Sequence, residues 1–226
     1  MLLTKTMLQN SFIILICTFL LSCSLLDSGN IAPGYKAAYD GIRSYFFPKE
    51  NEKITSQTIK NIPYASALIR IGKSSQSLII LESIDDDVFN YVSSDSIFLS
   101  FKQGRIVLSS GLSNNLVKFV DPFSLRDISL LTQEELSYLN LYSYDYPELI
   151  ELRVNARIEF IGLEEVDLFT TKKTLKRYEE TISNSYLGWK EKNIFWIDEE
   201  GYVWKSIQHI SPKLPAFEII ITKKPA

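Results

Sequence analysis

The chain has 226 residues, of which 46% are hydrophobic and 12% aromatic, and its formal net charge is −3. A mildly acidic chain lacks the broad basic surface that nucleic-acid binding requires, so we expect no nucleic-acid partner. Two cysteines and one histidine supply too few soft ligands for a disulfide framework or an ordinary zinc site, and we assign no metal residues and no bound cofactor.

Residues 1–22 predict a bacterial lipoprotein signal peptide. Lys5 supplies positive charge, and an apolar run follows from Phe12 to Leu21. This run is about half of the roughly 20 residues that a membrane-spanning helix needs. The residues Leu20-Leu21-Ser22-Cys23 match the lipobox, which places signal cleavage between Ser22 and Cys23. An ordinary signal peptide with a chance cysteine, or an uncleaved anchor, is the alternative.

Cys23 is the predicted lipidation site, carrying diacylglycerol and an N-acyl chain. The other cysteine, Cys17, would leave with the signal peptide. Because several acyl chains anchor a protein stably, we expect membrane attachment through this lipid. By analogy with bacterial sorting, Ser24 after the cysteine favours the outer membrane, with the domain facing the periplasm. Residues 23–31 would form a polar leash, and residues 32–226 one folded domain.

The first periodic segment of that domain is helical. Apolar residues at three- and four-residue spacing predict a helix over 35–46, which either packs on the domain or docks a partner. From residue 62 the period changes to two, and strands are expected over 65–71, 78–81, 88–93, 97–101, 105–108 and 116–120. Thr132 and Glu135 have capping-box spacing, so a short helix is predicted over 133–140.

A tyrosine-rich loop is expected next, with Tyr138, Tyr142, Tyr144 and Tyr146 either folded onto the core or contacting a sugar or a protein. Further strands are predicted over 152–160, 166–170, 175–182, 193–197, 202–206 and 217–222. The charged residues from Lys172 to Glu180 indicate a solvated hairpin end. Since no strand–helix–strand repeat occurs, we predict a mainly β, single-domain antiparallel barrel or sandwich with one or two short helices.

Sequence motifs for catalysis are absent. The chain has no G-x-S-x-G elbow, phosphate-binding glycine loop or dinucleotide fingerprint, and His209 is interpreted as structural. Glycoside hydrolysis needs a pair of carboxylates, for which Glu164 with Glu165, or Asp198 with Glu199 and Glu200, could be nominated. Both sets fall in probable turns, which do not provide the burial that tunes such acids. We therefore assign no catalytic residues.

Several short segments, in order behind the lipobox, resemble the YjbF/GfcB family of group 4 capsule and exopolysaccharide lipoproteins. These segments are 62–66, 70–72, 92–95, 104–105, 111–112, 195–198 and 201–208. Tyr91 and Ser96 stand where the family is expected to have Trp and Gly. The resemblance implies a barrel-like fold, a periplasm-facing outer-membrane lipoprotein and a role in polysaccharide production or export beside other envelope proteins. It implies no catalytic residues.

The predicted function is non-catalytic binding or scaffolding in capsule or exopolysaccharide production or export. The candidate contacts to the glycan or to a partner protein are Arg70, Arg105, Trp196, Asp198, Trp204 and Gln208. The tryptophans could instead belong to the core, and the polar residues could tie strand ends together. A polysaccharide-modifying enzyme and a purely structural envelope lipoprotein are the alternatives.

Overall fold

The computed structural model describes residues 54–130 and 135–225. The predicted signal peptide, Cys23, the leash and the helix expected over 35–46 lie outside the described residues. Contacts divide the chain into residues 1–48 and residues 49–226, and the second unit is described below. Within the described ranges, no helix is both long and apolar enough to cross a membrane.

The described residues of this unit form twelve strands and two short helices. The helices are α3 (Ser56–Asn61) and α4 (Leu125–Leu130). The strands are β1 (Ser66–Ile71), β2 (Ser77–Asp85), β3 (Val88–Ser93), β4 (Phe98–Lys102), β5 (Arg105–Ser110), β6 (Leu116–Val120), β7 (Glu135–Tyr144), β8 (Leu149–Asp167), β9 (Lys172–Asn184), β10 (Trp189–Ile197), β11 (Val203–Gln208) and β12 (Phe217–Lys223).

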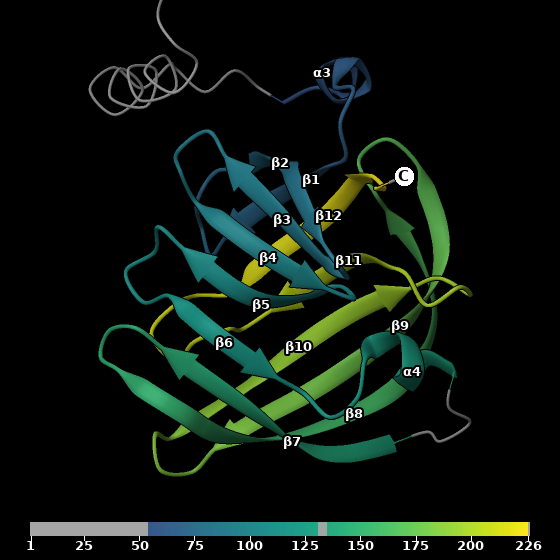
Figure 1. The fold of residues 1–226 in the computed structure, drawn as a ribbon. Coiled ribbons are helices and arrows are strands. Elements are labelled where there is room, and N and C mark those ends of the chain that lie inside the picture. Colours follow the sequence, from purple (N-terminus) through teal and green to yellow (C-terminus); the bar gives the residue numbers. More distant parts are fainter. Residues whose placement is uncertain (1–53, 131–134, 226) are drawn as a thin grey trace, which may run out of the picture. The chain divides into compact units, whose positions relative to one another are not determined.

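All twelve strands form one antiparallel sheet that curls into a nearly closed barrel (Figure 1). The order is β5-β4-β3-β2-β1-β12-β11-β10-β9-β8-β7-β6. Strands that follow one another in the sequence therefore pair, except β5 and β6, and β1 also pairs with β12. No backbone ladder joins the edge strands β5 and β6, which we call the seam. There the Leu116 N–H donates to the Ser109 hydroxyl at 2.9 Å. The predicted mainly β, barrel-like fold is confirmed.

The barrel interior is an apolar core built from alternate residues of the strands. On β8, for example, Val154, Ala156 and Ile158 are buried, whereas the intervening Asn155 and Arg157 are exposed. This alternation is the period-two pattern of a strand with one wet face. This alternation explains why the strand over residues 152–160 could be predicted from the sequence.

A second apolar cluster covers part of the outer face of the barrel. Leu68 of β1 and Ile220 of β12 pack there against Ile59 of α3 and against Leu168 and Leu175 near the β8–β9 turn. Strand β1 is therefore buried on both faces. A strand with two buried faces reads as a continuous apolar run, which accounts for the sequence around Ala67 to Ile69.

The sequence interpretation was wrong between residues 135 and 144. Where a helix and then a tyrosine-rich loop were expected, the structure has strand β7. Tyr138, Tyr142 and Tyr144 lie on its inward face, and only Tyr146 belongs to a loop, where it is exposed. A capping box is a local preference, whereas β7 is paired on both sides, by β6 and by β8.

Two smaller expectations also fail. Strand β8 runs from Leu149 to Asp167, so the strand predicted over 152–160 and the first two residues of the one predicted over 166–170 belong to one element, with a register shift between Phe160 and Gly162. Residues 168–170 lie between β8 and β9. Glu180 is fully buried on β9, where a solvated hairpin end was expected. Asp86 and Asp87 form the turn between β2 and β3.

Candidate functional site

A pocket of about 350 Å³ lies at the end of the barrel where the β4–β5 turn, α4, the β10–β11 turn and the C-terminal residues come together. We call it the mouth pocket. Figure 1 shows α4 beside the end of β10 at this end of the barrel. Most of its wall is apolar or aromatic, from Phe89, Tyr91, Phe101, Tyr202, Val203 and Ile219. Such a size and lining are typical of small-molecule sites.

The β10–β11 turn is shaped by Asp198. Its Oδ1 accepts the backbone N–H groups of Glu200 at 3.1 Å and Tyr202 at 2.8 Å. Its Oδ2 accepts the indole N–H of Trp204 at 2.8 Å. Gly201 has φ +84° in this turn, a conformation that glycine adopts at low cost. One carboxylate therefore fixes both the turn and an aromatic side chain of the pocket.

Two of the residues that line the pocket, Tyr91 and Tyr202, carry phenol hydroxyl groups. Tyr91 is only 3% exposed, and its ring packs edge-on against Phe101 with 5.5 Å between ring centroids. Within the described residues, neither the Tyr91 nor the Tyr202 hydroxyl has a hydrogen-bond partner. Burial raises the pKa of Tyr91 to about 12 and also raises the pKa of Tyr202. Both groups are therefore neutral phenols that can donate and accept hydrogen bonds.

The rim of the pocket is charged. Arg126, Glu200, Lys205 and Lys224 line it. The Lys224 ammonium lies 3.4 Å from the Glu200 carboxylate and 4.2 Å from the centroid of the Tyr202 ring. The Lys205 ammonium lies 3.4 Å from the Glu218 carboxylate and 5.2 Å from the centroid of the Trp196 ring.

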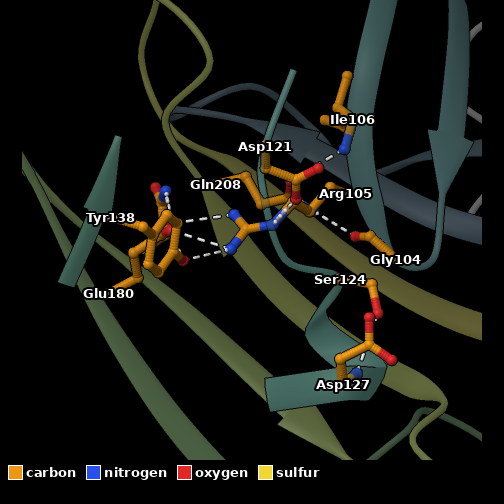
Figure 2. Close-up of polar contacts among 10 residues, drawn as sticks. Gly104, Arg105, Ile106, Asp121, Ser124, Asp127, Tyr138, Glu180 and Gln208 are labelled. Carbon is orange, nitrogen blue, oxygen red and sulfur yellow. Dashed lines mark hydrogen bonds and ion pairs between the residues drawn. The ribbon is translucent and has the colours of Figure 1, made fainter. Parts of the chain in front are cut away.

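A buried polar network crosses the barrel beneath the pocket, centred on Arg105 (Figure 2). Arg105 of β5 donates to both carboxylate oxygens of Glu180 on β9, at 3.0 and 2.9 Å, and to the Tyr138 hydroxyl at 2.8 Å. Its Nε lies 3.1 Å from an Asp121 oxygen just after β6. The guanidinium thus bridges the seam and ties β5 to the opposite wall.

The two acids of this network differ in their titration. Burial alone would raise the pKa of the Glu180 carboxyl, but the charge and hydrogen bonds of Arg105, with further hydrogen bonds from Tyr138 and Asn193, lower it below its usual range. For Asp121 burial outweighs the attraction of Arg105, and its pKa is raised. The Arg105–Glu180 pair is therefore ionised in the folded protein.

Gln208 makes a second connection across the barrel. Its carbonyl oxygen accepts the Ile106 N–H at 3.0 Å, and its amide donates to the Gly104 carbonyl at 2.8 Å and to the Ser206 hydroxyl at 2.9 Å. Gly104 and Ser206 both line the mouth pocket. Gln208 therefore holds the β4–β5 turn against β11 and fixes part of the pocket wall.

The structure brings four of the six predicted contact residues to this end of the barrel. Trp204 lines the pocket, Asp198 supports it, and Arg105 and Gln208 form the buried connections beneath it. The other two lie outside this site. Arg70 pairs with Glu218, and the buried Trp196 donates its indole N–H to Glu164 at 3.1 Å.

Sequence reasoning missed Tyr91, Arg126 and Lys224 as pocket residues. They come from β3, α4 and the C-terminal end, so no local spacing could have grouped them. The one available signal was Tyr91, noted only as a departure from the expected Trp. Among the described residues, no group of three or more His, Cys, Asp or Glu side chains could hold a metal ion.

Comparison with known proteins places this fold in a family. The family model for group 4 capsule polysaccharide lipoprotein gfcB, YjbF matches residues 39–221. The Escherichia coli K12 proteins named uncharacterized lipoprotein GfcB and uncharacterized lipoprotein YjbF are each 22% identical to the chain. The first match covers 81% of this chain and 87% of the relative, and the second covers 88% and 90%.

A solved structure has the same fold. The crystal structure of the hypothetical lipoprotein YmcC from Escherichia coli K12 superposes with a TM-score of 0.67 at 22% identity, covering 82% of this chain and 94% of that chain. The family match over residues 39–221 includes eleven of the twelve strands in full and most of β12. This chain belongs to the YjbF family of group 4 capsule polysaccharide lipoproteins.

Proposed function

We propose that this protein is an outer-membrane lipoprotein whose barrel faces the periplasm and assists capsule or exopolysaccharide production or export by binding a saccharide unit in the mouth pocket, without catalysis. The family description supplies the pathway. A lipid on Cys23 would hold the barrel at the membrane beside other envelope proteins of the export system.

The observation that carries this proposal is the combination of aromatic walls with two phenol hydroxyls that have no hydrogen-bond partner among the described residues. A sugar ring has an apolar face, which packs on aromatic side chains, and hydroxyl groups around its edge. The Tyr91 and Tyr202 hydroxyls can exchange hydrogen bonds with these groups. Neither hydroxyl oxygen is among the buried side-chain atoms that lack a partner, so both remain accessible to a ligand that enters the pocket.

The composition of the pocket favours binding over hydrolysis. Of the described residues that line it, Glu200 is the only acid, and it is 81% exposed and paired with Lys224. Glycoside hydrolysis ordinarily uses two carboxylates on opposite sides of the scissile bond, one of them with a pKa raised by burial. The second nominated pair, Glu164 with Glu165, lies on β8 outside the pocket lining.

Binding is tested with the lipidated full-length protein in phosphatidylcholine nanodiscs, first on a glycan array and then by calorimetry with the glycans that bind. Tyr91→Phe removes one hydroxyl and should weaken binding about five- to tenfold, as expected for one hydrogen bond of about 1 to 1.4 kcal/mol. Tyr186→Phe is the matched control, because Tyr186 is 89% exposed and not among the lining residues. If no glycan binds, or if reducing ends are released, the proposal is wrong.

A further inference from the structure

The geometry points to an acidic saccharide as the ligand of the mouth pocket, with Arg126 binding its carboxylate. This inference rests on the proposed function and adds the ligand's charge to it. Three cations, Arg126, Lys205 and Lys224, line the pocket together with one acid, Glu200. Two acids outside the lining, Glu218 and Asp198, lie 3.4 Å from the Lys205 ammonium and 4.0 Å from the Lys224 ammonium. Arg126 is therefore the lining cation that no described carboxylate neutralises.

Arg126 is held at the pocket by the packing of α4. Leu125 and Ile128 anchor the helix in a cluster with Ile197 and Val203. The Ser124 hydroxyl accepts the Asp127 N–H at 2.9 Å and caps the first turn (Figure 2). Since its neighbour in the chain is fully buried, Arg126 projects from a fixed backbone.

The stem of Arg126 lies directly on the β10–β11 turn. A Cβ added to Gly201 would lie 2.6 Å from the Arg126 Cγ, so this glycine makes the room that the arginine occupies. No described carboxylate lies within ion-pair distance of the Arg126 guanidinium. A planar guanidinium with several parallel N–H donors matches a carboxylate in a bidentate arrangement.

The other two cations are less suited to be the main contact. Lys205 is already held by Glu218 and by the ring of Trp196. Lys224 pairs with Glu200, whose side chain is 81% exposed, and exposed pairs contribute little. A ligand carboxylate at Arg126 can therefore also attract Lys224 at small cost, whereas Lys205 stays with Glu218.

The test compares two matched ligands, tetragalacturonate and the same tetrasaccharide with its carboxyl groups reduced to alcohols. Binding to the full-length protein in phosphatidylcholine nanodiscs is measured by calorimetry at 50 and 300 mM salt. The wild type should prefer the acidic ligand by about tenfold or more, as expected for a charged hydrogen bond, and the preference should shrink at high salt. Arg126→Gln should remove most of this preference, and Arg126→Lys should restore part of it.

Lys190→Gln is the control for charge alone, because Lys190 is an exposed cation of β10 that does not line the pocket. Equal binding of both ligands, still weakened by Tyr91→Phe, would overturn the acidic preference and leave saccharide binding intact. If neither tetrasaccharide binds, both proposals are wrong. If laurate at micromolar concentration displaces both tetrasaccharides, both proposals are also wrong, and the pocket binds an anionic amphiphile.

Discussion

Replacing Arg105 by methionine should destabilise the barrel far more than replacing an arginine of an exposed ion pair would. Arg105 is 4% exposed and its partner Glu180 is fully buried. Removing one member of a buried pair leaves an uncompensated charge and costs about 3–5 kcal/mol. Methionine retains most of the apolar stem. For a domain of this size, the midpoint of thermal unfolding should fall by roughly 6–20 °C at about 2–4 °C per kcal/mol.

The pH dependence of this loss separates a charge effect from a packing effect. In the wild type the pKa of Glu180 is lowered, so its contribution is present above the unfolded value of about 4.3 and is lost as the pH falls through the folded value. Without Arg105, burial dominates at both Glu180 and Asp121 and raises their pKa values, so the folded state binds more protons. The deficit of the Arg105→Met variant should therefore be largest at pH 7 and shrink toward pH 5.

Urea denaturation at pH 7 and pH 5 measures both effects. Arg157→Met is the matched control, because Arg157 pairs with Glu135 while its side chain is 57% exposed, and its loss should cost less than about 1 kcal/mol. Adding Glu180→Gln to Arg105→Met should recover about 2 kcal/mol or more, since the buried charge is gone. If Arg105→Met costs no more than the control, or if its deficit grows on acidification, the reasoning about a buried ion pair is refuted.

Three further predictions concern other parts of the chain. Gly104→Ala should lower the free energy of unfolding, measured by urea denaturation, by about 1–3 kcal/mol, because φ is +86° and the new Cβ would lie 2.3 Å from a side-chain carbon of β11. Gly188→Ala is the control: nothing lies within 4 Å of the new Cβ, and its cost should be about 1 kcal/mol. Asp198→Ala should cost about 1–3 kcal/mol and increase acrylamide quenching of Trp204. Cys23→Ser should abolish incorporation of labelled palmitate and release the protein into the soluble periplasmic fraction, and retention in the membrane would contradict the lipid anchor.

The strands were predictable from the sequence where one face is buried, because apolar and polar residues then alternate with a period of two. Residues 152–160 were identified for this reason and lie within β8. Residues 193–197 were identified by their aromatic and β-branched residues before a hairpin turn, and they lie within β10. The same period was present in β7, where Leu136, Tyr138 and Asn140 alternate with exposed residues. Because Asn140 is polar, it interrupts the series of apolar residues on the inward face. The capping-box spacing of Thr132 and Glu135 then led to the incorrect prediction of a helix over 133–140.

The mouth pocket was only partly predictable. The Asp198 turn and Trp204 were singled out because an aromatic strand pair around a four-residue turn is a local pattern. The contact of Arg126 with Gly201 depends on α4 folding against a turn about 75 residues further along the chain. Neither residue type nor spacing specifies that approach, because it results from closure of the barrel.

The adjacent acids Glu179 and Glu180 of β9 point to opposite faces of the barrel wall, which has a consequence for contacts with distant strands. Successive residues of a strand point to opposite faces, so two adjacent acids on a barrel strand send one inward. Glu179 faces outward and pairs with Arg177 and Lys192, while Glu180 enters the interior. A carboxylate there needs a cation from another strand. Arg105, the first residue of β5, supplies this cation. The two adjacent acids of β9 therefore predict a buried cation from another strand, although the sequence alone does not identify which residue it is.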